Sequence, residues 1–522
     1  MTSHDVVIAG AGHNSLVAAA YLVKAGFSVL VLEARNVVGG DTATEELTIP
    51  GFLHDSCSTA HTLLQSSPTI RDNELGLRDY GLEYLSPDPV VHVPFPDGTS
   101  ITQWRDLDRT TAELARFSVS DGRSFRTMIE DYEQVASIFT AFRYTPIGRG
   151  PGIDDRLAQH PDGRRWQRIR RWSAAEVIFD HFEDPRSRAF MLWLAFMTMQ
   201  PPQREETARL AYALPFGRQR HSWIVPKGGS RALPVALARF IEDRGGTILT
   251  ERRVIDLVIE SGRCVGVETA DGEVHRAEKA VLSTIHIKHL IEMAPTEAWG
   301  DDFRFAVDTW KPGITMCTAH YATTEAPQYA DGLIPLASGL PTSVERMLRV
   351  PNDFDRGVIA LDDPVLLILC PTVVDPTRAP DDHHTLKVVG FQPYQLPEGP
   401  DHWDEIMPDV AAANLEHLRR YAPNVTENNI LGTALKSPLD LERMNAHNWH
   451  GSCHGGDMGT DQMGSLRPAP GWAQHRTPIA GLYQTGATTH PGGSVSAGPG
   501  RNAAIVLLED LGSSLEAAIA AS

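Results

Sequence analysis

One stretch near the N-terminus, residues 5–33, restricts the fold more than any other part of the sequence. Residues 6–9 form an apolar run long enough for a strand that is buried on both faces. Apolar side chains then recur at helical intervals over residues 16–23, and a second apolar run at residues 29–32 ends in Glu33. This order predicts a strand, a helix and a second strand, which together form the first unit of a parallel α/β sheet.

The turn between the first strand and the helix has the spacing of a dinucleotide-binding loop. Gly10 allows a tight turn, Gly12 lets the backbone approach a pyrophosphate, and Ser15 places a small side chain at the third motif position. Free N–H groups at the helix N-terminus suit phosphates, and Glu33 follows Gly12 by about 20 residues, where a carboxylate binds a ribose. A βαβ unit without a ligand does not explain both glycines and the carboxylate, so we predict a bound dinucleotide. The expected contacts are Gly10, Gly12, His13, Asn14, Ser15, Glu33, Ala34 and Arg35.

Two further glycine-rich stretches favour a flavin over a nicotinamide cofactor. The pair Gly39-Gly40 follows the second strand, where the backbone can run alongside a cofactor that extends past its adenosine half. Near the other end of the chain, an expected strand over residues 477–487 leads into a glycine-rich turn and a helix N-terminus, which suits the negative charge of a reduced isoalloxazine. We therefore predict FAD, with Val254 offering backbone contacts to the adenine. The remaining expected contacts are Gly39, Gly40, Asp41, Thr42, Gly486, Ala487, Gly493, Ser494 and Val495.

Charge and cysteine usage exclude several classes of protein. The chain of 522 residues has a formal net charge of −19, which argues against nucleic-acid binding and against adhesion to anionic lipids by charge alone. Its five cysteines include no C-x-x-C pair, which disfavours disulphide reduction and indicates reduced thiols. No signal peptide precedes the first strand, and no apolar run approaches the ~20 residues needed to cross a bilayer. We expect a cytoplasmic protein, for which peripheral contact is the closest association with a membrane.

The length and the order of the expected elements predict two interleaved domains in an α/β fold. We expect a Rossmann-like FAD-binding domain built from residues 1–65, 221–285 and 465–522. A discontinuous α+β substrate domain takes residues 66–220, which are mostly helical, and residues 286–464.

Three histidines lie in glycine-rich or turn-rich stretches that we expect to meet the flavin. His61, His454 and His490 are candidates for the base that removes a proton when a hydride leaves a substrate carbon. The alternative for each is a structural histidine that orients its loop. A cluster of histidine and cysteine at residues 447–454 suggests a metal site, but the glycines among them indicate a loop rather than firm elements, so we predict no metal.

The sequence resembles the phytoene desaturase-type flavoproteins in three stretches. These are GAGHNSLVAAAYLVKAGFSVLVLEARNVVGG from Gly10, PKGGSRALPVALARFIEDRGG from Pro226, and GLYQTGATTHPGGSVSAGPGRNAA from Gly481. The chain is similar in particular to the flavin-type bacterial beta-carotene ketolases and to the group of pyridine nucleotide-disulphide oxidoreductase domain-containing protein 2. The resemblance implies non-covalent FAD, a two-domain fold built like amine oxidases, and redox chemistry on a carbon skeleton. Asp41 and Ala487 depart from the family, which often has an arginine and an acidic residue at these places.

These expectations favour an FAD-dependent oxidoreductase that desaturates or otherwise oxidises a hydrophobic, polyene- or isoprenoid-like small molecule by hydride transfer to flavin N5. The chain has no second dinucleotide motif, so oxygen or a quinone is the expected electron acceptor. The apolar run at residues 190–199 is either a buried core helix or the wall of an apolar substrate cavity. Two other functions stay open: a flavin amine oxidase, which shares the fold, and an FAD-stabilised interaction protein with little turnover.

Overall fold

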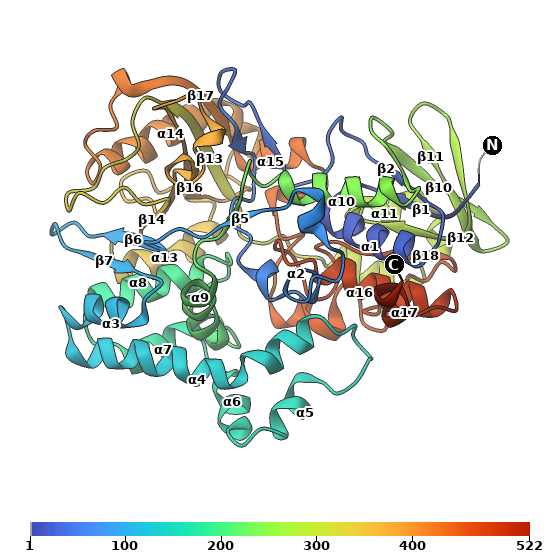
Figure 1. The fold of residues 1–522 in the computed structure, drawn as a ribbon, viewed down its shortest axis with the longest axis horizontal. Helices are drawn as coiled ribbons and strands as arrows, with labels where there is room; N and C mark the ends of the chain where they lie inside the picture. The colour runs from blue at the N-terminus through green and yellow to red at the C-terminus, as the bar shows by residue number, and fades with distance from the viewer. Residues whose placement is uncertain (1–2, 522) are drawn as a thin grey trace.

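Strands from three separated parts of the chain form the first large sheet of the computed structural model, which describes residues 3–521 (Figure 1). Its parallel part has the order β18–β12–β1–β2–β9, and the antiparallel strands β11 and β10 continue the sheet from the first half of β12. The strands are β1 (His4–Ala9), β2 (Val29–Leu32), β9 (Thr247–Leu249), β10 (Val254–Glu260), β11 (Arg263–Thr269), β12 (Val274–Ser283) and β18 (Leu482–Gln484).

Both faces of the parallel strands are buried, which explains the continuous apolar runs in the sequence. On β1, Val6 and Ile8 belong to a core cluster with one group of helices, whereas Val7 and Ala9 belong to a second cluster on the opposite face. The first group is α1 (His13–Lys24), α10 (Ala232–Asp243), α16 (Gly498–Asp510) and α17 (Leu515–Ala520). The second face is covered by α11 (Ile287–Leu290), α12 (Asp301–Asp308) and side chains of β10 and β11.

A second sheet lies at the other side of the molecule and is mainly antiparallel (Figure 1). Its order is β17–β13–β16–β15–β14–β6–β7, with only the β14–β6 pair parallel among the described strands. Helix α14 (Trp403–Arg419) packs on one face of it. The strands are β6 (Val91–Pro94), β7 (Ser100–Gln103), β13 (Met316–Thr323), β14 (Ala337–Leu340), β15 (Leu366–Leu369), β16 (His384–Phe391) and β17 (Ile430–Lys436).

A layer of helices packs against the opposite face of the second sheet. Two of these helices begin with a polar cap: the Asp106 side chain accepts hydrogen bonds at the start of α3 (Leu107–Ala115), and Ser118 does so for α4 (Val119–Arg143). The helices are α3 (Leu107–Ala115), α4 (Val119–Arg143), α5 (Ile153–Ala158), α6 (Gly163–Ile169), α7 (Ala174–His181), α8 (Pro185–Phe196), α9 (Ala208–His221) and α13 (Val344–Asp355). Shorter elements include α2 (Pro68–Arg71), α15 (Pro438–Met444), β3 (Thr44–Glu45), β4 (His54–Asp55), β5 (Tyr84–Leu85) and β8 (Val225–Pro226).

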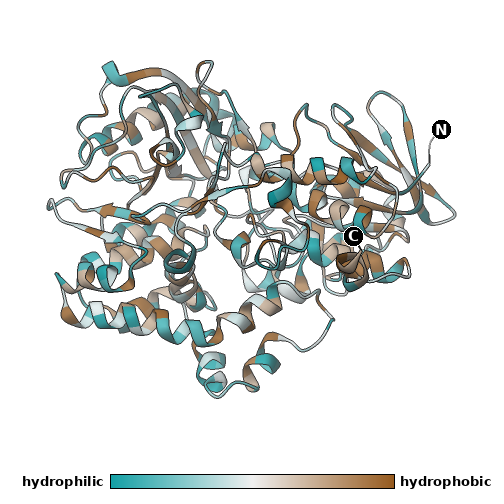
Figure 2. Ribbon diagram, viewed as in Figure 1, coloured by the Kyte–Doolittle hydropathy of each residue, from teal (hydrophilic) through white to brown (hydrophobic). Residues whose placement is uncertain are grey.

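Helix α8 contains most of the apolar run at residues 190–199, and it is a core helix. Residues 189–196 are all buried. Figure 2 shows brown, apolar residues in helices and strands throughout both parts of the molecule. The Trp193 indole donates a hydrogen bond to the Leu366 carbonyl (3.1 Å) and stacks on Trp223. Because residues 189–196 are enclosed by protein, the core interpretation explains the composition of this run.

The expected α/β fold, with a Rossmann-like unit joined to a discontinuous α+β unit, is confirmed. The first sheet draws its strands from residues 4–32, 247–283 and 482–484, which fall inside the three segments expected for the FAD-binding domain. The domain boundaries themselves stay a prediction. Among residues 3–521, no helix has both the length and the apolar composition required to cross a bilayer.

Candidate functional site

A cavity of about 940 Å³ opens at the carboxyl ends of the parallel strands. Gly10 follows β1, Glu33 follows β2 and Thr284 follows β12, and all three line the cavity. Met316, the first residue of β13, lines it from the second sheet. Its volume is at the upper end of the range of about 300–1,000 Å³ found for small-molecule sites, so a large cofactor and part of a substrate fit together.

The glycine turn after β1 lies against this cavity. Gly10 has a φ of +95°, and an added Cβ would come within 2.2 Å of Thr284 Oγ1, so a side chain is excluded there. A Cβ at Gly12 would meet no protein atom within 4 Å. Packing within the protein therefore does not require glycine here, but a side chain would occupy space in the cavity that a ligand can use. Ser15 does not line the cavity: its hydroxyl lies 2.6 Å from the Gly10 carbonyl and 2.9 Å from the Gly12 carbonyl, which ties the turn together.

Glu33 connects the glycine turn to the end of β2. Its Oε2 accepts a hydrogen bond from the Ala11 N–H (2.7 Å) and its Oε1 accepts one from the Arg35 N–H (2.8 Å). The side chain is buried apart from the surface that it shows to the cavity. Because each carboxylate oxygen has a second lone pair, the fixed carboxylate can still accept hydrogen bonds from a ribose.

The glycine pair after β2 lies beside the first glycine turn. The Gly39 N–H donates to the Ala11 carbonyl (2.8 Å), and Gly39, Gly40 and Asp41 all line the cavity with Ala34 and Arg35. Asp41 Oδ1 accepts hydrogen bonds from the amides of Asn445 (2.9 Å) and Asn448 (3.0 Å). Thr42 lies outside the lining and donates to the Gly39 carbonyl (2.6 Å). Asp41 therefore joins the cofactor turn to a segment about 400 residues later.

The C-terminal glycine-rich stretch lines the same cavity through Gly486, Ala487, Ser494 and Val495. Gly493 lies behind them, where an added Cβ would come within 2.4 Å of the His454 Cα. Helix α16 begins beside α1, because a Cβ at Gly500 would come within 2.1 Å of the Asn14 carbonyl oxygen. The two motifs that lie at opposite ends of the sequence are therefore adjacent in the fold, and Val254 on β10 completes the set of expected residues that line the cavity.

The three candidate histidines have different surroundings. His454 lines the cavity, and burial lowers its pKa to about 4, so its ring is neutral near pH 7. His61 lies outside the lining, where Nδ1 is 3.0 Å from the Tyr84 hydroxyl and Nε2 is 2.8 Å from the Ser230 hydroxyl. His490 also lies outside it, with Nε2 3.2 Å from the Phe142 carbonyl. The structure thus brings one of the three histidines to the cavity, and its catalytic role stays a prediction.

The comparisons with known proteins identify the family. Residues 16–498 match the family described as flavin containing amine oxidoreductase. The chain belongs to this family. It is 28% identical to mouse pyridine nucleotide-disulfide oxidoreductase domain-containing protein 2 over 97% of this chain and 94% of that protein. It is 27% identical to a limonene dehydrogenase subunit of Castellaniella defragrans (97% and 95% covered), and 25% identical to the neurosporene-forming phytoene desaturase of Cereibacter sphaeroides (94% and 91%).

Solved structures share the fold of this flavin containing amine oxidoreductase. A variant of putrescine oxidase superposes with a TM-score of 0.65 at 16% identity, covering 98% of this chain and 99% of that chain. An oxidoreductase from Methanosarcina mazei superposes with a TM-score of 0.61 at 18% identity, covering 97% and 99%. The expected resemblance, the oxidoreductase class and the FAD cofactor are confirmed by the family match.

Unpartnered polar atoms in the cavity wall fit the cofactor of a flavin containing amine oxidoreductase. Among residues 3–521, the buried atoms His13 Nε2, Asn14 Oδ1 and Arg35 Nη1 have no hydrogen-bond partner, and all three residues line the cavity beside the glycine turn. Buried polar atoms cost free energy until a ligand satisfies them. Ring N–H, guanidinium and amide groups are suitable partners for a diphosphate and a ribose, so these residues would hold the adenosine half of FAD together with Glu33.

Sequence reasoning missed a second group of lining residues. They come from the loop after β4, from the loop and α11 after β12, from the start of β13 and from the region around α15, and they are Ser58, Thr59, Ala60, Thr284, Ile285, His286, His289, Met316, Met444, Asn445 and His447. Thr284 had a usable signal, because it directly follows a predicted parallel strand, and ligands bind at the carboxyl ends of such strands. The loops around Ala60 and Met444 have no local signal, because long-range packing alone brings them to the cavity.

Proposed function

We propose that this flavin containing amine oxidoreductase desaturates, or otherwise oxidises, a hydrophobic polyene- or isoprenoid-like small molecule. FAD, when bound, supplies the hydride acceptor at N5, with oxygen or a quinone as the final electron acceptor. In this proposal the adenosine half lies at Gly12 and Glu33, and the flavin half lies at Gly486, Ala487 and Val495. The observation that carries the proposal is the composition of the wall that remains for a substrate.

Outside the dinucleotide contacts, the cavity wall includes five apolar or thiol side chains, beside the charged Glu442 and Arg443. Cys57 and Ala60 come from the loop after β4, Met316 from β13, Met444 from the end of α15, and Cys453 from the loop that follows. Thioether and thiol side chains are polarisable and adapt to irregular apolar ligands. Burial of each ligand CH₂ contributes about 0.8 kcal/mol, so a long hydrocarbon binds such a wall without a charged anchor.

The same wall disfavours an amine substrate. Proteins recognise ammonium groups with aromatic cages or free carboxylates, and among the described residues none of those that line the cavity is Phe, Tyr or Trp. The carboxylates of Asp41 and Glu442 hold loops of the protein together: Asp41 Oδ1 accepts hydrogen bonds from two asparagine amides, and Glu442 accepts them from the Tyr394 hydroxyl and the His450 backbone N–H. Glu33 belongs to the dinucleotide part. Glu292 lies in the segment after α11 that packs on β10. Because β10 begins at Val254, the expected adenine contact, Glu292 also lies at the dinucleotide end of the cavity.

His454 is our candidate for the group that takes the proton released with the hydride. This residue lines the cavity, next in sequence to Cys453 of the same wall. A neutral imidazole can accept a proton, and its pKa of about 4 keeps it neutral through the physiological range. His61 and His490 hold structural hydrogen bonds instead, and we assign them no contact with the substrate.

The names of two relatives agree with an apolar substrate. One belongs to a limonene dehydrogenase and the other is a phytoene desaturase, and limonene and phytoene are both hydrocarbons. This likeness supports the substrate class and leaves the individual compound to experiment.

Anaerobic reduction of the bound flavin tests the proposal. Purified holoprotein is mixed with terpene and polyene hydrocarbons in detergent and, separately, with monoamines and polyamines, while the flavin absorbance is followed. We expect bleaching by one or more hydrocarbons and none by amines. Met444→Lys, which places a charge in the wall, should reduce this bleaching while FAD stays bound; Leu466→Lys, at an exposed position, is the matched control.

The alternatives give different results in the same experiment. Bleaching by amines alone, with release of peroxide in air, would establish an amine oxidase. Bound FAD that no candidate reductant bleaches would favour an interaction protein.

A further inference from the structure

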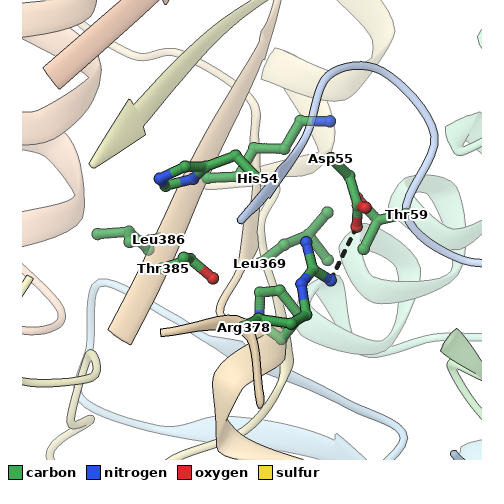
Figure 3. Close-up of a pocket in the computed structure, with 9 residues that line it drawn as sticks. His54, Asp55, Thr59, Leu369, Arg378, Thr385 and Leu386 are labelled. Carbon is green, nitrogen blue, oxygen red and sulfur yellow. Dashed lines mark ion pairs between the residues drawn. The ribbon is translucent and has the colours of Figure 1, made fainter. Parts of the chain in front are cut away.

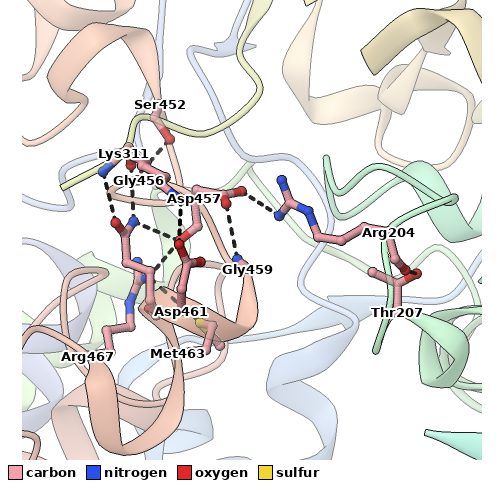
Figure 4. Close-up of polar contacts among 11 residues, drawn as sticks. Arg204, Thr207, Lys311, Ser452, Gly456, Asp457, Gly459, Asp461, Met463 and Arg467 are labelled. Carbon is pink, nitrogen blue, oxygen red and sulfur yellow. Dashed lines mark hydrogen bonds and ion pairs between the residues drawn. The ribbon is translucent and has the colours of Figure 1, made fainter. Parts of the chain in front are cut away.

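Arg467 is a fully buried arginine that lies behind the cavity wall. It precedes β18, in the segment that Figure 4 shows among residues 452–467. Within residues 3–521 its guanidinium has no carboxylate within ion-pair distance, in contrast to Arg378, which pairs with Asp55 at 3.0 Å (Figure 3). A buried cation without a counter-ion is costly and needs a reason.

The guanidinium is instead held by backbone carbonyls. Nε and Nη2 donate to the Ala487 carbonyl (2.9 and 2.6 Å), and Nη2 also donates to the His454 carbonyl (3.0 Å). Nη1 donates to the carbonyls of Asp457 (2.9 Å) and Gln462 (3.0 Å). Ala487 and His454 both line the cavity, so Arg467 fixes the backbone of two of its walls at once.

The positive charge is retained and is not neutralised. Burial lowers the pKa of Arg467 to about 9, which leaves the group protonated at neutral pH. The carboxylate of Asp457, whose charge acts in the opposite direction on this pKa, is engaged by Arg204 at 2.8 Å and accepts a hydrogen bond from the Gly459 N–H (Figure 4). Because Asp457 is paired with another cation, the electric field of Arg467 reaches the cavity through the Ala487 peptide.

We propose that Arg467 is a positioning residue for the flavin end of the cavity, and that its uncompensated charge favours the reduced, anionic flavin over the oxidised one. The inference rests on the proposed function, which places the flavin half of FAD at Ala487. A fixed charge in a water-excluded wall acts without the reorganisation that solvent needs. Reduction adds negative charge to the ring, so a cation behind Ala487 stabilises the product of hydride transfer more than the oxidised state.

The first test compares the midpoint potential of bound FAD in three variants. Arg467→Met removes the charge, and we expect a more negative potential, equivalent to roughly a tenfold loss of the preference for reduced FAD. Arg467→Lys keeps the charge but not the planar set of donors, so it should weaken binding of both redox states and keep the potential near that of the unsubstituted protein. Arg346→Met removes a buried arginine on α13 that is paired with Asp353, and it should leave the potential unchanged.

A second pair of variants leaves Arg467 in place, so the test does not depend on whether Arg467→Met folds. Arg204→Gln releases the Asp457 carboxylate to neutralise Arg467, and the potential should fall. Asp457→Asn removes that carboxylate, and the potential should rise. An unchanged potential in both Arg204→Gln and Asp457→Asn, with FAD bound, would overturn the inference, whether or not Arg467→Met folds. Failure of the unsubstituted protein to take up FAD or to be reduced by hydrocarbons would instead overturn the proposed function.

Discussion

At the scale of single residues, Glu33 serves the protein before any cofactor binds. Its carboxylate accepts two backbone hydrogen bonds, from Ala11 and Arg35, and so holds the glycine turn against the end of β2. Replacement of Glu33 therefore affects both the fold of the turn and the ribose contact. Gly12 is different, because only a ligand competes for the space in front of it.

We expect Glu33→Ala to weaken FAD binding by about 1–3 kcal/mol, because the ribose loses its acceptor. Two backbone donors also lose their partner, so the apoprotein should unfold at a lower temperature. Glu33→Gln keeps one acceptor oxygen, so it should lose less FAD affinity and less thermal stability than Glu33→Ala. Titration of apoprotein with FAD measures the binding, and an unchanged dissociation constant in the alanine variant would show that Glu33 is not the ribose ligand.

We expect His454→Gln to slow anaerobic flavin reduction by about 10²–10⁴-fold while FAD remains bound, because the proton acceptor is lost. With a pKa of about 4, the ring is neutral above pH 5. The reduction rate of the unsubstituted protein should then be flat from pH 5 to 8 and fall as the pH drops through about 4. His490→Gln, outside the cavity lining, is the matched control. Equal rates for both variants would remove His454 from the mechanism.

At the scale of elements, α8 belongs to the hydrophobic core and does not line the cavity. Trp193 on this helix packs against Gly339 of β14, where an added Cβ would come within 2.4 Å of the indole ring. The apolar run at residues 190–199 thus fills the space between the helical layer and the second sheet. The wall expected for a substrate comes instead from loops and from the ends of β13 and α15.

We expect Trp193→Ala to lower the free energy of unfolding by about 3–5 kcal/mol, because it opens a cavity in the core. Trp193→Phe should cost less, and Trp193→Glu should not give folded protein. Denaturant unfolding of the apoproteins measures the effect. A stable Trp193→Glu variant that binds FAD but has lost activity would instead place α8 in the wall of a substrate tunnel.

At the scale of the whole molecule, many histidines are buried in the neutral form. Burial lowers the pKa to about 4 for His13, His54, His454 and His490, and to about 3 for His61 and His475. In the unfolded chain these rings titrate near pH 6.5. Between pH 6.5 and 4 the unfolded state therefore binds protons that the folded state does not, and stability falls as the pH falls.

We expect the thermal midpoint to change little from pH 8 to 7 and to drop steeply from pH 6 to 5. Each buried histidine contributes a loss of about 1.4 kcal/mol per pH unit below 6.5. Carboxylates with a lowered pKa also reduce stability as the pH falls, but only at lower pH. The change between pH 6 and 5 is therefore due to the histidines. Differential scanning fluorimetry of apoprotein measures the curve, and equal midpoints at pH 7 and pH 5 would contradict the assignment.

The sequence was sufficient wherever the physical cause is local. The strand, glycine turn and helix at residues 5–33 follow from periodicity and from the φ of Gly10, and the C-terminal glycine-rich turn follows from the same rules. Contacts between distant segments were not predictable: Asp41 binds Asn445 and Asn448, and His61 is enclosed by Tyr84 and Ser230. In such cases the surroundings of a side chain depend on tertiary packing, which a single sequence does not display.

The pairing of β18 with β12, and the packing of α16 on α1, have a consequence for synthesis of the chain on the ribosome. Helix α1 is among the first elements to emerge, but α16, which packs on it, is among the last residues translated. At about 5–20 residues per second, roughly 25–100 seconds separate the appearance of α1 from that of α16. During this interval the face of α1 that packs on α16 stays uncovered, which leaves an apolar surface open to chaperones. A chain released before residue 482 lacks β18, and one released before residue 498 lacks α16.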